Sequence, residues 1–151
     1  LAAKTGIYGM IGGQTVDVEL SGGPIPKNKL DFIYRLKTGA LIEASMLIGA
    51  VLGGAAEEDC KIVESLAGKV GLAFQIQDDI LDVTGNQEVL GKPVGSDAKN
   101  EKATYVTYEG LKKAQEDVKR YSKHAVNLLE SLVVKNEFLI HLVEYLIHRE
   151  K

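Results

Sequence analysis

Three aspartates in one short segment are the residues of this chain best suited to bind a metal ion. Residues 74–82 read FQIQDDILD and place Asp78, Asp79 and Asp82 within two turns of one expected helix. Asp78 and Asp82 are four residues apart, so their carboxylates share a helix face, whereas Asp79 lies about 100° round the axis from Asp78. Carboxylates this close repel one another, and they need a compensating cation when they are withdrawn from water.

The surroundings of the three aspartates are mostly apolar. Between Ile62 and Val83 the only other charged residues are Glu64 and Lys69. An all-oxygen cluster with no His or Cys beside it favours a hard divalent ion such as Mg²⁺. An acidic helix end that faces water is the alternative interpretation.

Two neighbouring residues share the face of the aspartates. Gln75 precedes Asp78 by three residues, so its amide could bind a metal-bound water or a phosphate oxygen, or could be an ordinary buried amide. Phe74 is on the same stripe and is best interpreted as a core residue.

A second group of interest interrupts a well-patterned helix at Lys37, Thr38 and Gly39. Thr can bond back to the carbonyl four residues earlier and Gly loosens the next turn, so a kink is expected there. A kink would aim Lys37 into the bundle, although a lysine beside apolar surface usually extends towards water.

The pattern predicts an all-α helical bundle, since no alternation typical of a strand is present. The expected first helix contains several glycines, which is tolerable only with tight packing or local irregularity. Residues 84–102, punctuated by Gly and Pro, are expected to form a long functional loop. The helices are expected at residues 2–20, 29–53, 57–83, 104–133 (with a weak point at Gly110) and 136–148.

Composition excludes several classes of protein. The net charge of −3 gives no support for nucleic-acid binding. The single cysteine, Cys60, rules out an internal disulfide and fits a reducing cytoplasm. The longest uncharged stretch, residues 44–56, has 13 residues and is too short to cross a bilayer core of about 30 Å.

The FQxxDDxxD pattern resembles the second aspartate-rich motif of the trans-prenyl diphosphate synthases, the family of the farnesyl and geranylgeranyl diphosphate synthases. Three further segments match that family in order: LAAKTGIYGMIGGQTVD resembles its GQ-containing helix, KTGALIEAS its KT helix, and LGKPVGSDAKNEKATY its lysine-bearing loop. The resemblance covers essentially all of the chain and implies the C-terminal portion of the isoprenoid synthase fold.

The resemblance assigns roles to individual residues. It implies that Lys37, Thr38, Lys92 and Lys102 contact the diphosphate of an allylic substrate, and that Gln14 lines the cavity for the isoprenoid substrates. By the same resemblance Phe74 and Gln75 belong to the substrate site, with Gln75 also catalytic. Asp78, Asp79 and Asp82 hold the metal, supported by Asp97. Asp17, near Gln14, and the basic end His148-Arg149-Glu150-Lys151 are less firmly assigned, and a solvated, frayed end is the alternative for the latter.

The implied reaction joins an allylic diphosphate to isopentenyl diphosphate, with three Mg²⁺ ions and several lysines stabilising the departing diphosphate. The implied product is of the farnesyl or geranylgeranyl type, and the implied complete enzyme is a cytoplasmic homodimer without a membrane span. Family members choose product length mainly near the first aspartate motif, which has no counterpart here, so product length is not predicted.

The chain lacks an initiator Met and opens within a helix-like pattern. We therefore expect residues 1–151 to be the C-terminal part of a single synthase domain whose N-terminal half is absent, whether removed or a separate polypeptide. Such a portion is expected to be inactive alone, because it holds one wall of a two-walled metal site. A non-catalytic helical partner or regulatory subunit of a synthase is the main alternative, beside a helical bundle that binds nothing and a class I terpene cyclase.

Overall fold

The computed structural model describes residues 1–85 and 103–149, and within them it contains helices and no strand, which confirms the predicted all-α class. Residues 86–102, and with them most of the predicted functional loop, lie outside the described residues. The elements are α1 (Ala2–Thr5), α2 (Met10–Glu19), α3 (Lys27–Ile33), the π-helix η1 (Tyr34–Gly39), α4 (Ala40–Leu52), α5 (Glu57–Thr84), α8 (Tyr105–Glu109), α9 (Leu111–Ser131) and α10 (Glu137–His148).

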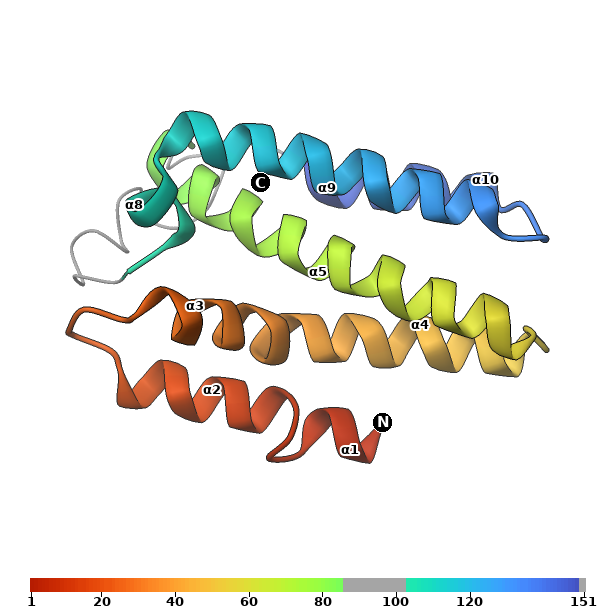
Figure 1. The fold of residues 1–151 in the computed structure, drawn as a ribbon, viewed down its shortest axis with the longest axis horizontal. Coiled ribbons are helices and arrows are strands. Elements are labelled where there is room, and N and C mark those ends of the chain that lie inside the picture. The colour runs from red at the N-terminus through yellow and green to blue at the C-terminus, as the bar shows by residue number, and fades with distance from the viewer. Residues whose placement is uncertain (86–102, 150–151) are drawn as a thin grey trace.

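The helices are arranged in layers around α5. Figure 1 shows α1 and α2 below the continuous run of α3, η1 and α4, with α5 crossing above that run and α9 above α5. Helix α2 packs on η1 and α3, while α5 contacts η1, α4, α8, α9 and α10. Helix α5 is therefore in contact with most of the bundle, and these contacts fix its position relative to the other helices.

The sequence of α5 explains its central place. The helix begins with Glu57, Glu58 and Asp59, which favour the positive end of the helix dipole. Small and branched apolar residues then fill its buried faces and exclude water almost completely. This core set on α5 consists of Val63, Leu66, Ala67, Val70, Ala73, Ile76, Ile80 and Leu81.

Two helices predicted as continuous are broken. The expected helix at 2–20 is divided at residues 6–9 into α1 and α2, so the local irregularity considered for its glycines is present. The expected helix at 104–133 breaks at Gly110, as its weak point predicted, because Gly110 has φ of 80°, a conformation that side chains disfavour.

Two glycines allow close contact with η1. A Cβ atom on Gly13 of α2 would lie 2.4 Å from the backbone nitrogen of Lys37, and one on Gly71 of α5 would lie 2.9 Å from Cα of Gly39. Neither position has room for a methyl group without moving backbone. The π-helix is thus held between two helices at contact distances that require glycine.

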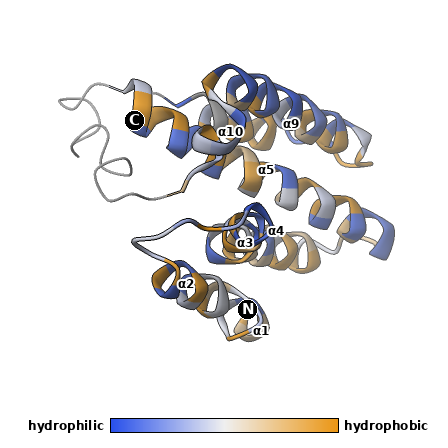
Figure 2. Ribbon diagram, turned by 60° about the vertical axis from the view of Figure 1, so that its left-hand side comes forward, coloured by the Kyte–Doolittle hydropathy of each residue, from blue (hydrophilic) through white to orange (hydrophobic). Residues whose placement is uncertain are grey.

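Among the helices that the structure describes, none is both long and apolar enough to cross a membrane. The bundle nevertheless exposes apolar side chains in the turn before α2, on α2 and α4, in the connection after α9 and on α10, and Figure 2 shows hydrophobic residues along α2, α4 and α10. The most exposed among the described residues are Leu1, Ile7, Tyr8, Val18, Val51, Leu52, Val133, Val134, Phe138 and Tyr145.

We predict that Gly71→Ala lowers the free energy of unfolding by about 1–3 kcal/mol, because the added methyl group forces α5 away from η1. Gly68→Ala is the matched control: its Cβ meets nothing within 4 Å, and the change should raise that free energy by about 0.5–1 kcal/mol. Urea denaturation of both variants makes the comparison. Equal changes in the free energy of unfolding at the two positions would show that the close contact of Gly71 with η1 does not determine stability.

Candidate functional site

Two side-chain hydrogen bonds join η1 to α5 where these helices are in contact. The hydroxyl of Thr38 donates to Oε1 of Gln75 at 2.9 Å, and the hydroxyl of Tyr34 donates to the carboxylate of Asp79. Tyr34 and Thr38 are four residues apart on η1, and Gln75 and Asp79 are four apart on α5. These two hydrogen bonds therefore hold the segment with Lys37 and Thr38 against residues 74–82, the segment with the three aspartates.

The interruption predicted at Lys37, Thr38 and Gly39 is a π-helical turn in an otherwise α-helical run. Such turns are wider than α-helical ones, are rare, and occur frequently at functional sites. Here the π-turn has Gly13 of α2 on one side and Gly71 of α5 on the other.

Lys37 is paired rather than solvated. Its ammonium lies 2.5 Å from Oδ2 of Asp17, and the two side chains are 33% and 10% exposed. Asp17 is buried on α2, which packs against η1. The sequence alone left the role of Asp17 uncertain, whereas the structure gives it a defined ion pair with Lys37. Its carboxylate keeps the ammonium of Lys37 within the bundle.

Asp78 faces the C-terminal end of the chain. Its carboxylate is paired with the guanidinium of Arg149 at 2.7 Å, and that guanidinium lies 3.6 Å from the centre of the Phe74 ring. Gln77 also donates to the carbonyl of Arg149 at 3.3 Å. The Arg149 side chain is only 12% exposed. The interpretation of the basic chain end as a solvated, frayed tail is therefore wrong for Arg149. The Arg149 side chain packs on Phe74 and Asp78 of α5.

The three predicted metal ligands have different surroundings. The Asp78 side chain is 44% exposed, whereas Asp79 and Asp82 are buried. Asp79 accepts from Tyr34 and also from the backbone N–H of Tyr105 at 2.7 Å. Within the described ranges, no three His, Cys, Asp or Glu side chains converge closely enough to share an ion.

The remaining predicted residues are only partly placed. Gln14 is half-buried and lines a shallow hollow on α2 with other residues of the same helix. Lys92, Asp97 and Lys102 lie outside the described residues.

Two tyrosines that sequence reasoning did not select organise the site. Tyr34 and Tyr105 are buried, and their hydroxyls bond to Asp79 and Asp117 respectively. A buried tyrosine needs a partner for its hydroxyl. That requirement was the only signal in the sequence, and it does not identify the partner.

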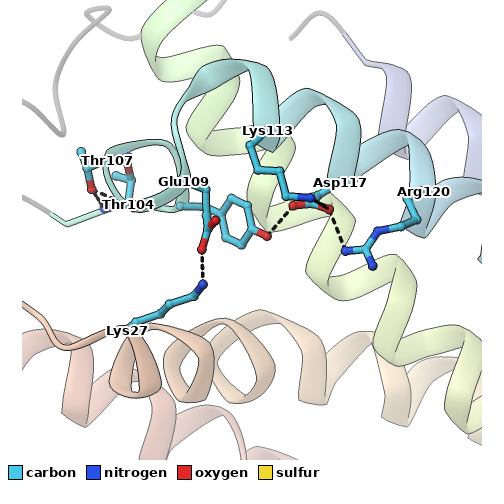
Figure 3. A network of polar contacts seen from close by, with 8 residues as sticks. Lys27, Thr104, Thr107, Glu109, Lys113, Asp117 and Arg120 are labelled. Atoms are coloured by element: carbon cyan, nitrogen blue, oxygen red, sulfur yellow. Dashed lines mark hydrogen bonds and ion pairs between the residues drawn. The ribbon is translucent and has the colours of Figure 1, made fainter.

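A buried carboxylate on α9 secures the position of Tyr105. Asp117 accepts from the Tyr105 hydroxyl, from Lys113 at 2.9 Å and from Arg120 at 2.7 Å (Figure 3). Burial by itself raises the pKa of Asp117, but the hydrogen bonds from Lys113, Tyr105 and Arg120 outweigh it, and the pKa is lowered. Burial and the bond to Asp117 raise the pKa of the Tyr105 hydroxyl, which therefore stays protonated.

Comparisons with known proteins identify the family of the chain. The family model described as polyprenyl synthetase matches residues 3–136. The chain is 38% identical to farnesyl diphosphate synthase of Geobacillus stearothermophilus over 150 residues, covering 99% of this chain and 50% of that protein. It is likewise 38% identical to the Escherichia coli farnesyl diphosphate synthase over 155 residues, covering 100% and 52%.

The solved structures include a Helicobacter pylori geranyltransferase complexed with magnesium and isoprenyl diphosphate. It superposes with a TM-score of 0.79 at 33% identity, covering 97% of this chain and 48% of that one. The chain belongs to the polyprenyl synthetase family, and it spans about half the length of the curated relatives it matches.

We predict that Asp117→Asn destabilises the fold at pH 7 by about 1–3 kcal/mol, since it weakens three hydrogen bonds to a buried charge. A carboxyl with a lowered folded-state pKa contributes fully above its unfolded pKa of about 3.9 and loses its contribution as pH falls through the folded value. The gap between wild type and variant should therefore close below about pH 4.

Urea denaturation between pH 7 and pH 2 measures this gap. Asp31→Asn, at an exposed position on α3, is the control and should change the free energy of unfolding by less than about 0.5 kcal/mol. A gap for Asp117→Asn that is the same at both ends of the pH range would contradict the assigned charge.

Proposed function

We propose that this chain is the C-terminal part of a prenyltransferase that joins an allylic diphosphate to isopentenyl diphosphate and yields a short-chain prenyl diphosphate. The observation that supports this most strongly is the pairing of η1 with α5, where Thr38 bonds Gln75 beside Lys37 and Asp78. Relatives named as farnesyl diphosphate synthases add support, at 38% identity over about half their length.

Asp78 fits the proposed metal best of the three aspartates. Its carboxylate is partly exposed and already neutralises one cation, Arg149, and carboxylate oxygen is the donor that Mg²⁺ prefers. Mg²⁺ bound there would supply positive charge to the oxygens of the departing diphosphate. In the complete site three ions are proposed, held between this wall and a second aspartate motif.

Lys37 and Thr38 are the described residues proposed to bind the diphosphate. Lys37 can turn from Asp17 towards an incoming phosphate, because its side chain is one-third exposed and its flexible stem allows a new geometry. Thr38 and Gln75 would offer polar contacts to phosphate oxygens or to water on the metal. Lys92 and Lys102, and Asp97 as a support of the metal shell, complete the proposal.

The hydrocarbon of the substrate needs a surface that excludes water, since an allylic cation reacts with it. An apolar groove lies between α4, α5 and α10, and its lining includes Leu41, four residues after Lys37, and Leu146, three residues before Arg149. We propose that such faces, together with the rest of the domain, shield the isoprenoid. No observation among the described residues favours a non-catalytic subunit.

The rest of the proposal concerns the complete protein. The exposed apolar residues on α2, α4 and α10 suit packing against the other half of a synthase domain. We propose a homodimer of complete domains in the cytoplasm, and no turnover by these 151 residues alone, because the isopentenyl diphosphate site has no counterpart here.

We predict that Mg²⁺ and pyrophosphate bind cooperatively to the full-length protein, because each neutralises charge that opposes the other. Titration calorimetry with Mg²⁺, in the presence and absence of pyrophosphate, measures this coupling. Asp78→Ala should abolish it, and Lys37→Ala should weaken pyrophosphate about 10-fold or more.

Asp31→Ala and Lys29→Ala, at exposed positions of α3, are the matched controls and should bind as the wild type does. Coupled binding that survives in Asp78→Ala would exclude Asp78 as the metal ligand. Pyrophosphate affinity that is unchanged in Lys37→Ala would leave that lysine as only a partner of Asp17.

A further inference from the structure

The short helix α8 is held in place by side-chain contacts at its start. It has five residues, too few to be stable as an isolated helix, so its position depends on the rest of the bundle. Thr104 caps it, the Tyr105 backbone N–H donates to the Tyr34 hydroxyl of η1 at 3.1 Å, and the Tyr105 hydroxyl donates to Asp117 of α9 at 2.9 Å. The start of α8 is therefore fixed between η1 and α9.

A second set of contacts ties the end of α8 to the start of α3. The Tyr108 hydroxyl donates to the backbone carbonyl of Ile25, two residues before α3 begins. Glu109, the last residue of α8, is paired with Lys27, the first residue of α3 (Figure 3). Ile25 is 1% exposed, so its carbonyl needs a partner within the protein. The end of α8 thus fixes the place where α3 begins.

We propose that Tyr108 and Glu109 are positioning residues for the diphosphate and act through the run of α3 and η1; this inference rests on the proposed function. Helix α3 continues directly into η1, which contains Lys37 and Thr38. Helix α3 packs mainly on α2 and η1, whereas the two contacts from α8 tie it to the layer of α5 and α9. A shift at the start of α3 therefore changes how the π-turn is held relative to α5.

The strength of each contact limits its effect on binding. A contact changes the affinity of a ligand only by the free energy with which it favours the orientation that the ligand needs. The Lys27 and Glu109 side chains are 53% and 24% exposed, and so exposed an ion pair contributes less than about a tenfold change, or about 1.4 kcal/mol. The Tyr108 bond is partly buried, and its loss leaves a buried carbonyl without this donor, so Tyr108→Phe should have the larger effect.

Charge reversal of the ion pair tests the proposal in the full-length protein. Glu at the first residue of α3 and Lys at the last residue of α8 both suit the helix dipole, so the helices are retained. Calorimetry with pyrophosphate at saturating Mg²⁺ should show that Lys27→Glu and Glu109→Lys each weaken pyrophosphate by about 3-fold to 10-fold. The double variant Lys27→Glu/Glu109→Lys should return to within about 2-fold of the wild type.

The direction of the two single changes separates positioning from long-range charge. A general charge effect would weaken the anion in Lys27→Glu and strengthen it in Glu109→Lys, whereas loss of the contact weakens it in both. Lys61→Glu is the matched control, since it breaks an exposed pair with Glu57 and makes the same change of charge. Its pyrophosphate affinity should stay within about 2-fold of the wild type.

Tyr108→Phe should weaken pyrophosphate on the order of 10-fold and leave the Mg²⁺ concentration for half-saturation, measured without pyrophosphate, within about 2-fold. The reason is that the contact holds α3, whereas the proposed ion lies on α5. Val63→Ala, at a buried position near the start of α5, is the control for a general loss of stability and should leave both values within about 2-fold. If Tyr108→Phe does not fold, the charge reversals decide.

Unchanged pyrophosphate affinity in both single reversals overturns the proposal, as does a double variant that stays as weak as the single ones. Opposite effects of Lys27→Glu and Glu109→Lys overturn it as well, because they would show an effect of charge alone. Failure of the wild type to bind Mg²⁺ and pyrophosphate together would instead overturn the proposed function. The two failures are therefore distinguishable.

Discussion

The contact between the π-helix η1 and helix α5 is the constraint on which the rest of the site depends. Three pairings run along it: Tyr34 with Asp79, Thr38 with Gln75, and Gly39 with Gly71. Their partners on α5 are spaced four residues apart, so they occupy one face of that helix. Two are hydrogen bonds to buried or half-buried groups, and the third is a backbone contact that requires glycine. Together they fix the register between the segment that holds Lys37 and the segment that holds Asp78.

The charges that face this contact are balanced within the chain. Lys37 is paired with Asp17, and Asp78 is paired with Arg149, so each of these two charged groups has a partner of opposite sign. Partly buried charges are costly without such partners, which explains why an apolar bundle tolerates them. Under the proposed function, binding would be an exchange in which a divalent ion replaces Arg149 at Asp78 and a diphosphate replaces Asp17 at Lys37. Because the protein partners must be displaced, ion and diphosphate gain most by arriving together.

Local patterning was enough to predict the helical class, the break at Gly110 and the interruption at Lys37–Gly39, because each depends on residues near in sequence. It also selected Gln75 and Asp78, since their spacing places them on one helix face, whereas Thr38 was selected because it interrupts a helical pattern and through the family resemblance. It could not predict the partners. The bonds from Tyr34 to Asp79 and from Tyr105 to Asp117, and the packing of Arg149 on Phe74, join residues from different elements, and helical periodicity contains no information on such pairs. The division of the 2–20 helix was missed as a break because four glycines permit either tight packing or irregularity, and both are present.

The most direct test of this account is a crystal structure of the full-length protein with Mn²⁺ and pyrophosphate, in which anomalous scattering locates the ion. The account predicts Mn²⁺ at about 2.1 Å from an Asp78 oxygen, with Arg149 displaced. It also predicts that Lys37 has turned from Asp17 to a pyrophosphate oxygen, and that Asp79 still bonds Tyr34. An ion that does not contact Asp78, or a pyrophosphate that touches neither Lys37 nor the ion, would contradict it.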